Sequence, residues 1–309
     1  MRHFDSVQLA SIELFCKAAE LGSFTAAAEG LGITPASVSR SIGRLEARLG
    51  VRLFARTTRS IKLTCEGELY YQHCQQALEQ ISEVERMITG DQHSPSGTLR
   101  ISVGTPYAHY RLLPLLPKFQ AKYPQIEIEL NISNRVIDFV EEGFDLAIRL
   151  GIPKDSRLIA RTLEDATLGV FAAPEYLQQY AEPKTVAALD QHQCIQFILP
   201  STGRAMPWIF KDSHGNDFNY GFKSHRRVYD DVMGCLTWAK AGGGLFQIYH
   251  FIAQPAVERG ELVEVLSTLT PRTRRFSILY PQNRHMSAKI RIFVDFLMQE
   301  IAVLQHHAS

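Results

Sequence analysis

The sequence predicts a protein of mixed class: a small helical unit, then one long helix, then a larger region in which strands alternate with helices. Three observations predict this order. Apolar residues recur at helical spacing near the N-terminus, a heptad pattern covers residues 70–88, and short apolar runs separated by helical segments fill the remainder. At 309 residues the chain is long enough for two domains.

The composition is that of a globular protein and excludes several classes. Hydrophobic residues make up 45% and charged residues 21%, so a core can form and disorder is excluded as the main state. No apolar run reaches the length of a membrane span, and residues 1–6 lack the pattern of a signal peptide. The five cysteines show no CxxC spacing, which argues against a disulfide framework and structural zinc. We therefore expect a cytoplasmic protein without a membrane partner, metal or cofactor.

Three helices are predicted at the N-terminus. Gly22 ends the first, and Ser23 can cap the second. The third begins with Thr34 as N-cap and Pro35 at the first helical position, where no N–H is needed, and it ends at Gly50. Its two faces follow the same spacing: Val38, Ile42, Leu45 and Leu49 are predicted to be buried, and Ser37, Ser41, Arg44 and Arg48 to lie on the opposite side.

Two short strands are expected next, residues 51–54 and 61–64, around a polar tip. Helices joined by a tight turn and followed by a basic hairpin make a winged helix-turn-helix. Basic residues are concentrated here. Residues 37–64 have a net charge of +6, from one acid, Glu46, and these seven bases: Arg40, Arg44, Arg48, Arg52, Arg56, Arg59 and Lys62.

This local charge matches a phosphate-binding footprint, and the third helix matches the major groove. Ser37 and Ser39 offer short hydroxyls, while Arg40 and Arg44 can reach bases or phosphates. A three-helix bundle with a solvated basic surface is the alternative.

One long helix is expected from about residue 66 to residue 89. Its apolar residues keep an unbroken heptad spacing, which favours a dimer seam over a helix packed only on its own domain. The seam consists of Tyr70, Cys74, Ala77, Ile81, Val84 and Ile88. Residues 91–97 then form a polar hinge linker. The expected domains are residues 1–64, the linker helix and hinge 65–97, and residues 98–309.

The third region alternates strands and helices, which predicts parallel sheets with right-handed crossovers, arranged in two α/β lobes. Ligands in such folds bind beyond the carboxyl ends of the strands. Expected strands are 99–103, 126–132, 145–150, 168–172, 195–199, 245–248 and 276–280, and expected helices are 111–122, 135–142, 231–241 and 287–304.

The chain resembles the LysR-type transcriptional regulators. The resemblance is strongest in residues 24–29 (FTAAAE), 38–42 (VSRSI) and 45–59 (LEARLGVRLFARTTR), followed by Leu63, Thr64 and Gly67. It is looser at residues 112–124, 144–149 (FDLAIR) and 241–244 (AGGG). The phrase from Asp145 to Arg149 is similar to that of a large subgroup of the family.

The resemblance implies a regulator that binds double-stranded DNA at an interrupted palindrome, as a homodimer or homotetramer, with RNA polymerase as a candidate partner. It implies a two-lobed effector domain of the periplasmic-binding-protein type, with lobe 1 at residues 98–164 and 268–305 and lobe 2 at 165–267. The recognition helix would be residues 35–49, with Arg56 and Arg59 in the wing. The expected DNA-binding residues are Thr34, Pro35, Ala36, Ser37, Ser39, Arg40, Arg44, Arg56 and Arg59.

A small effector, expected to be an anion, would bind between the lobes. Thr105 would cap the helix after the first strand, and Arg149 could bind a carboxylate or pair with Asp145 or another nearby acid. Asp231 is expected as a helix cap. The candidate effector-binding residues are Thr105, Tyr107, Arg149, Ser201, Thr202, Asp231 and Gln247.

The sequence also departs from the family. Pro35-Ala36-Ser37 stands where many members have Gln-Pro-Ala, Gly243 where a bulkier residue is usual, and Tyr249 where a proline is expected. An enzyme or a plain small-molecule-binding protein of α/β fold is the alternative of another class. The chain has no HExxH or GxSxG motif, so no catalytic residue is assigned. A redox sensor using Cys194 and Cys235 is a further alternative.

Overall fold

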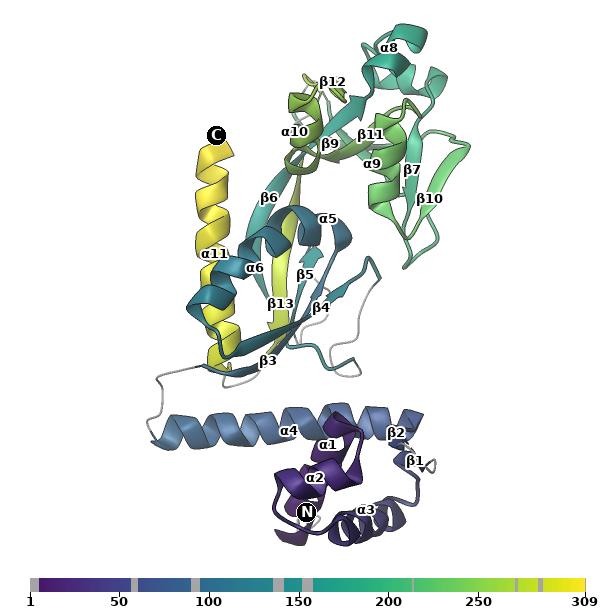
Figure 1. Ribbon diagram of the computed structural model, residues 1–309. Coiled ribbons are helices and arrows are strands. Elements are labelled where there is room, and N and C mark those ends of the chain that lie inside the picture. The colour runs from purple at the N-terminus through teal and green to yellow at the C-terminus, as the bar shows by residue number, and fades with distance from the viewer. Residues whose placement is uncertain are drawn as a thin grey trace. The chain divides into compact units, whose positions relative to one another are not determined.

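The computed structural model describes residues 6–56, 61–89, 95–135, 142–151, 158–212, 214–269, 272–282 and 286–308 (Figure 1). The chain divides into two compact units, an N-terminal unit of residues 1–93 and a C-terminal unit of residues 94–309. Among the described helices, none has both the length and the apolar character needed to cross a membrane.

Three short helices, a two-stranded hairpin and a long helix form the N-terminal unit, so the predicted winged helix-turn-helix is confirmed (Figure 1). Strands β1 and β2 pair antiparallel, with Phe54 opposite Leu63. The element bounds are α1 Ser6–Leu21, α2 Phe24–Gly30, α3 Pro35–Leu49, β1 Phe54–Arg56, β2 Ile61–Leu63 and α4 Cys65–Thr89.

Side-chain caps fix where α2 and α3 begin, as predicted. The Ser23 hydroxyl accepts a hydrogen bond from the Ala26 N–H at 3.2 Å. The Thr34 hydroxyl accepts one from the Ser37 N–H, also at 3.2 Å, and Pro35 occupies the first turn of α3. Gly50 ends the helix in the left-handed region, at φ 75°. These caps satisfy N–H groups that a helix start leaves without partners.

The core of this unit lies between α1, α3 and the hairpin, and the ring of Phe15 is at its centre. Its centroid lies 5.3 Å from that of Phe54 and 5.4 Å from that of Tyr70. From α3, Val38, Ile42 and Leu45 are buried as predicted. Leu49 is 38% exposed, so its predicted burial is wrong: it is the last residue of α3, beyond the core.

The close approach of α4 to the hairpin requires a glycine at position 67. A Cβ added to Gly67 would lie 2.0 Å from the Leu53 carbonyl oxygen. Thr64 fixes the same junction. Its hydroxyl donates to the Arg52 carbonyl at 2.7 Å and accepts from the Gly67 N–H at 3.0 Å. The position of α4 on the hairpin is therefore set by the close approach of Gly67 to the Leu53 backbone and by the two hydrogen bonds of the Thr64 hydroxyl.

The C-terminal unit is built on one seven-stranded mixed sheet, and the prediction of purely parallel sheets is wrong. Strand β3 pairs parallel with β4 and β5, while β13 runs antiparallel to both β5 and β6. The two long strands carry the chain between the lobes, and they must run in opposite directions because one leaves lobe 1 and the other returns. The strands of this sheet are β3 Gly97–Val103, β4 Ile126–Ile132, β5 Leu146–Leu150, β6 Leu158–Ala172, β11 Phe246–Tyr249, β12 Val263–Val265 and β13 Arg272–Pro281.

The ladder between β6 and β13 is long and contains one irregularity. Phe276 is opposite Glu164, but Ser277 is opposite Thr162, so Leu163 is an extra residue on β6. Strand pairing resumes on both sides of this bulge. A bulge bends the strand and increases its local twist.

Helices cover the sheet, and two small strand pairs complete lobe 2. In Figure 1, α6 and α11 lie along lobe 1, while α8, α9 and α10 belong to lobe 2. The predicted helix at residues 135–142 lies largely outside the described residues. The remaining elements are α5 Thr105–Tyr107, a π-helical turn Ala108–Leu112, α6 Leu113–Lys122, α8 Pro174–Tyr180, a 3-10 turn Val186–Gln191, β7 Ile195–Ile198, β8 Trp208–Lys211, β9 Asp217–Tyr220, β10 Arg226–Tyr229, α9 Val232–Lys240, α10 His250–Glu258 and α11 Ala288–Ala308.

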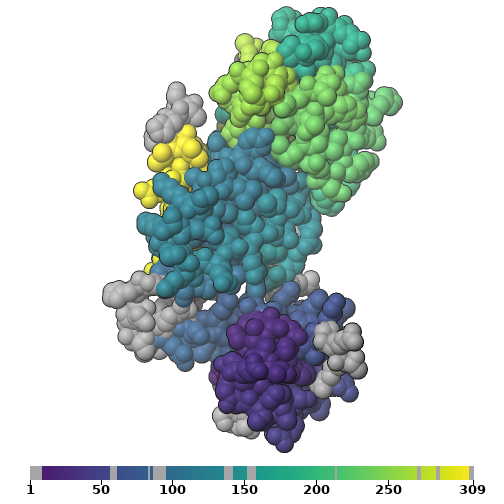
Figure 2. Space-filling view, in the orientation of Figure 1, coloured from purple at the N-terminus to yellow at the C-terminus, as the bar shows by residue number. Residues whose placement is uncertain are grey.

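One apolar core runs through both lobes, so the two lobes form a single unit. Figure 2 shows lobe 1 in blue and teal directly against lobe 2 in green. The small pairs of lobe 2 have different directions: β7 and β10 are parallel, while β8 and β9 are antiparallel.

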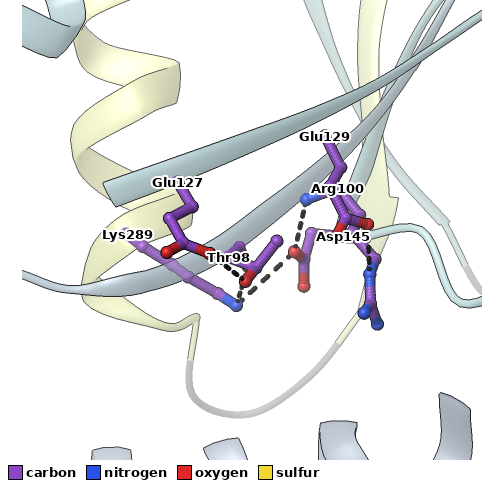
Figure 3. Close-up of polar contacts among 6 residues, drawn as sticks. All are labelled: Thr98, Arg100, Glu127, Glu129, Asp145 and Lys289. Carbon is purple, nitrogen blue, oxygen red and sulfur yellow. Dashed lines mark hydrogen bonds and ion pairs between the residues drawn. The ribbon is translucent and has the colours of Figure 1, made fainter. Parts of the chain in front are cut away.

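A polar cluster fixes the first residues of β3, where the chain enters the C-terminal unit (Figure 3). Lys289, only 7% exposed, donates to the Thr98 carbonyl at 2.5 Å and lies 3.5 Å from the Asp145 carboxylate. That carboxylate also accepts from the Arg100 N–H at 2.9 Å. Strand β3, the start of β5 and helix α11 are thus tied together by one buried cation and one carboxylate.

Candidate DNA interface and effector site

The exposed side of α3 presents small polar and basic groups. Thr34, Ala36, Arg40 and Arg44 are exposed, while Ser37 and Ser39 are half-buried. The hydroxyls of Thr34 and Ser37 lie 2.8 Å apart, and the Arg40 guanidinium lies 3.5 Å from the Ser37 hydroxyl. The groups at the start of α3 are therefore short and already oriented, and the long cations follow one turn later.

Ser41 does not belong to this face, which corrects the prediction from spacing. It is 5% exposed, and its hydroxyl lies 2.9 Å from that of Ser11 on α1. A small hydroxyl can be buried when it finds a partner, and helical spacing alone cannot reveal a partner 30 residues away. Arg40 and Arg44, one turn apart, thus form the exposed basic row.

Glu46 has a structural role that sequence reasoning missed. It is 5% exposed and accepts hydrogen bonds from the N–H groups of Leu53 at 2.9 Å and Phe54 at 3.1 Å. Arg52 lies 3.5 Å from the same carboxylate. The sequence did hold one signal: Glu46 is the single acid among the basic residues of 37–64. An acid would weaken a phosphate-binding surface, so its presence there indicates a structural role. Glu46 holds the start of the wing against α3.

Two predicted DNA-binding residues of the wing, Arg56 and Arg59, have side chains that cannot be placed. Arg59 lies outside the described residues, and the side chain of Arg56 is likewise not described. The strands that carry the wing pair from Phe54–Leu63 to Arg56–Ile61.

The predicted seam on α4 divides into two halves. Cys74 is buried and Tyr70 half-buried against the core of the N-terminal unit. Ala77, Ile81 and Val84 are exposed, the last two by 42% and 47%, and the side chain of Ile88 is not described. The first half of the heptad pattern therefore serves the unit's own core, as the alternative interpretation expected. The second half presents an exposed apolar row.

A small apolar cavity of about 30 Å³ lies in lobe 2 beside the strands that join the lobes. Aromatic and aliphatic side chains make most of its wall, and Gln247 is the one predicted effector residue that lines it. The lining residues are Leu168, Phe197, Met206, Pro207, Trp208, Val232, Phe246, Gln247, Ile248, Tyr249 and Arg274.

The Gln247 amide is fully engaged by the fold. Its oxygen accepts from the Ile209 N–H, and its nitrogen donates to the Ile209 carbonyl, each at 2.9 Å. The side chain therefore takes the place of a strand on the edge of β8 that β9 does not pair with. Tyr249, the departure from the family's proline, also lines the cavity, and burial raises the pKa of its phenol to about 12 despite the nearby Arg274.

The lobes are joined near this cavity by Asn134, which sequence reasoning missed. Its amide oxygen accepts from the Thr105 N–H of lobe 1 at 3.1 Å, and its amide nitrogen donates to the Asp230 carbonyl of lobe 2 at 3.0 Å. The prediction that Thr105 caps its helix is wrong. Gly104 is the N-cap, because Thr105 has already entered the helix, and Asn134 satisfies its N–H. Asp231 does cap α9, accepting from the Met233 N–H at 2.9 Å.

A second contact between the lobes is made by a buried ion pair of lobe 1, which packs against Phe251 of lobe 2. Arg111 donates two hydrogen bonds to the Glu164 carboxylate, at 3.1 and 2.9 Å, and Glu164 is 5% exposed. The guanidinium also lies 4.3 Å from the centre of the Phe251 ring of lobe 2. Tyr107 packs beside this group, with its ring fully buried 6.2 Å from that of Phe251 in lobe 2. Tyr107 is thus part of the junction between the lobes.

The other candidate residues are separated. The Arg149 guanidinium donates to the Ser102 hydroxyl at 2.6 Å and to the Ile148 carbonyl at 3.0 Å, so the expected pairing with Asp145 is wrong. Asp145 lies instead at the Lys289 cluster. Burial lowers the pKa of Arg149 to about 10. Ser201 and Thr202 lie exposed in the turn after β7.

The cysteines give no support to a redox sensor. Cys194 and Cys235 are buried, and burial raises the pKa of each thiol to about 12. Since the thiolate is the reactive form, both are protected from oxidants at neutral pH.

Gly243 stands where the family usually has a bulkier residue, and packing explains this departure: a Cβ there would lie 2.0 Å from the Trp238 ring.

A helix-turn-helix with an exposed basic face, on a chain that also carries a two-lobed domain with an apolar cavity, defines a DNA-binding transcriptional regulator with an effector domain. The chain belongs to the LysR family. Residues 9–68 match the family of bacterial regulatory helix-turn-helix proteins of the lysR family, and residues 92–302 match the LysR substrate binding domain.

Similar proteins are regulators rather than enzymes. An HTH-type transcriptional repressor of Pseudomonas aeruginosa is 34% identical over 296 residues, covering 96% of this chain and 92% of the relative. The regulator CrgA of Neisseria meningitidis is 33% identical, covering 94% and 96%. Its solved structure has a TM-score of 0.61 at 31% identity, covering 97% of this chain and 99% of that one. The full-length Vibrio cholerae virulence activator AphB has a TM-score of 0.59 at 29% identity, covering 94% and 98%.

Proposed function

We propose that this LysR-type regulator binds an interrupted palindrome as a homodimer or homotetramer, and that a small molecule in the lobe 2 cavity controls its output. The observation that carries the proposal is the position of this small cavity in the two-lobed domain. It lies beside β13, one of the two strands that join the lobes, so its occupant can change how the lobes meet.

DNA recognition is assigned to α3. Its N-terminal residues, including Thr34 and Ser37, are short enough for close approach to base edges, and Arg40 and Arg44 reach bases or phosphates beyond them. Arg56 and Arg59 are proposed to contact the DNA backbone or the minor groove from the wing. Pro35-Ala36-Ser37 removes the glutamine that many family members have at this turn, so the base preference differs accordingly.

Dimerisation is assigned to the exposed half of the α4 seam. Ile81 and Val84 continue the heptad row and are exposed, by 42% and 47%. A second copy of α4 would bury them and place two recognition helices on one duplex. Two-fold symmetry then requires half-sites about one helical turn apart, or a multiple of it.

We further place the chain in the subgroup that shares the phrase Asp145 to Arg149, and in the cytoplasm, where its DNA is. RNA polymerase remains a proposed partner. The domains are proposed as residues 1–64, the linker 65–97 and the effector domain 98–309. Within the last, Thr105, Asn134 and Asp230 connect the lobes, and we propose that an effector acts on this connection.

Native mass spectrometry of the protein purified from cells tests the effector assignment. We expect a non-covalent small-molecule adduct on the wild-type protein. The variant Val232→Trp, which fills the cavity, should lose the adduct and its transcriptional response, while Val263→Trp, an exposed position on β12, should keep both. A Val232→Trp protein that still responds normally would contradict the proposal.

A further inference from the structure

Two arginines of α3 each have a serine three residues before them. Ser37 precedes Arg40, and Ser41 precedes Arg44, so the members of each pair are neighbours one turn apart on the helix. From this local pattern the two arginines should have the same surroundings. The structure gives them different ones.

Arg40 is supported by a short row of hydroxyl groups. Its guanidinium donates to the Ser37 hydroxyl at 3.5 Å, and this hydroxyl lies 2.8 Å from that of Thr34. Thr34 is fixed in turn, because its oxygen accepts the Ser37 N–H at 3.2 Å as the cap of α3. The Arg40 guanidinium is therefore held on one side by a hydroxyl that the start of the helix keeps in place.

Arg44 does not have this support. The Ser41 hydroxyl is buried in the unit's core, where it lies 2.9 Å from the Ser11 hydroxyl. Among the described residues, Arg44 has no hydrogen-bonded or ionic partner, and its side chain is exposed. Of these two arginines, Arg40 is the one that is oriented before DNA arrives.

The two kinds of DNA contact make different demands on an arginine. A phosphate attracts positive charge and carries no sequence information, so a mobile side chain is sufficient. Reading a guanine requires two N–H groups aimed at its O6 and N7 atoms in the major groove. A guanidinium has five N–H donors, so one can stay on Ser37 while two face the base. A side chain that is already oriented also loses less rotamer freedom when it binds.

We infer that Arg40 reads a guanine of the operator, that Ser37 positions it, and that Arg44 contacts the phosphate backbone. This inference rests on the proposed function, in which α3 binds the major groove, and it divides the roles of the two arginines there. Ser37 is the last residue of Pro35-Ala36-Ser37, which stands where many family members have Gln-Pro-Ala. An alanine at this place has no hydroxyl, so those members cannot support the arginine in the same way.

The experiment uses the full-length protein and a selected operator. The operator is selected in vitro from a pool of random duplexes, and its guanines are then replaced one at a time by 7-deazaguanine, which lacks the N7 acceptor. Fluorescence anisotropy measures the affinity for each duplex and for random DNA over a range of salt concentrations. For the wild-type protein we expect a guanine in each half-site whose replacement weakens binding.

The two arginines should respond differently to substitution. Arg40→Lys keeps the charge but not the planar fork, so it should weaken cognate binding about five- to a hundredfold, keep the salt slope and abolish the response to 7-deazaguanine. Arg44→Ala should weaken binding to cognate and random duplexes alike, lower the salt slope by about one and keep that response. Arg48→Lys is the matched control, at an exposed position of α3 outside the proposed DNA-binding residues, and should change none of these quantities.

Ser37→Ala tests the positioning role. It should weaken cognate binding about two- to tenfold and reduce the response to 7-deazaguanine, with the affinity for random DNA unchanged. The cap of α3 uses the backbone N–H of residue 37, so the helix start is retained in this variant. In an Arg40→Ala background Ser37→Ala should have no further effect, because the group that it positions is absent.

The inference is overturned if no replaced guanine weakens wild-type binding, or if Arg40→Lys protein still responds to 7-deazaguanine. It is also overturned if Ser37→Ala protein has wild-type cognate affinity. A further loss from Ser37→Ala in the Arg40→Ala background would show that Ser37 contacts DNA itself and would overturn its positioning role. Failure of the proposed function is recognised separately, because a protein that selects no sequence from the pool does not recognise an operator at all.

Discussion

The exposed face of α3 and the cavity of lobe 2 are assembled over very different distances along the chain. The face comes from one helix of 15 residues. The start of this helix is capped by the Thr34 hydroxyl, which accepts from the N–H of Ser37, only three residues further along the chain. The cavity wall comes from residues between Leu168 and Arg274, and its shape depends on pairings such as Gln247 with Ile209. We therefore expect a substitution on the exposed face of α3 to affect only the proposed contact to DNA, whereas a substitution near the cavity should disturb the fold as well.

Disrupting the α4 seam tests whether operator binding needs two α3 faces. This change has the largest expected effect. Ile81→Asp combined with Val84→Asp would bury two like charges in each copy of the seam, which costs several kcal/mol per ion. We expect analytical ultracentrifugation to show loss of the dimer and gel shifts to show loss of operator binding. Both side chains are exposed within the chain, so the monomer should still fold.

The control for this variant is Gln80→Asp, an exposed position one residue before the seam, which should leave the dimer intact. A double variant that remains dimeric and still binds its operator would contradict the heptad interpretation.

The dependence of the cavity region on long-range contacts can be tested at the Arg111–Glu164 pair. Glu164→Leu leaves a largely buried guanidinium without its counter-ion, and breaking a buried pair in this way typically costs about 3–5 kcal/mol. Chemical denaturation should show this loss. Asp165→Asn, which breaks the exposed pair with Arg275, should cost at most about 1 kcal/mol. Equal losses for the two variants would remove the distinction between the two pairs.

On α3 the expected effects are smaller and confined to DNA binding. Arg40→Ala should cost about 1–3 kcal/mol at the cognate site and relax specificity there, with no loss of fold, because the side chain is exposed. Fluorescence anisotropy on cognate and random duplexes measures both. Arg59→Ala should instead weaken binding to every sequence alike and reduce the salt slope by about one. If Arg40→Ala lost equal affinity on both duplexes, Arg40 would be only a backbone contact.

The thiols provide the smallest expected effect. Burial raises the pKa of Cys16, Cys194 and Cys235 to about 12 and that of Cys74 in the same direction, while Cys65 is exposed. At pH 8 a thiol-specific chromophoric reagent should therefore modify one cysteine per chain quickly. The buried protonated thiols stabilise the fold below their ordinary pKa of 9.0, and this stabilisation is lost as the pH rises toward 12. Rapid reaction of Cys235 at pH 8 would reopen the redox alternative.

The sequence predicts the DNA-binding part well because its signals are local. Caps at Ser23 and Thr34 and the burial of Val38 and Ile42 follow from spacing of three or four residues. The predictions fail where a partner is distant in the chain: Ser41 is buried because it meets Ser11, and Tyr70 and Cys74 because the hairpin and α1 lie under them.

The effector domain shows the same limit more strongly. Spacing located most of its strands, but not their directions, which depend on the return of β13 between β5 and β6. Arg274 and Asn134 carry no local pattern, since an isolated arginine or asparagine is ordinary in any loop or strand. Only the fold brings Arg274 to an apolar wall and Asn134 between two lobes.

The long pairing between β6 and β13 limits how the two lobes of the effector domain can move relative to each other. Sliding of one lobe along the other would break the hydrogen bonds of the paired strands together, so we expect twisting and bending to be the accessible motions. These should concentrate at the bulge, where Leu163 interrupts the register. Glu164, the next residue, is held to lobe 1 by Arg111. We therefore expect any movement of lobe 2 to be a rotation about this bulge, so that the two lobes change their angle rather than their separation.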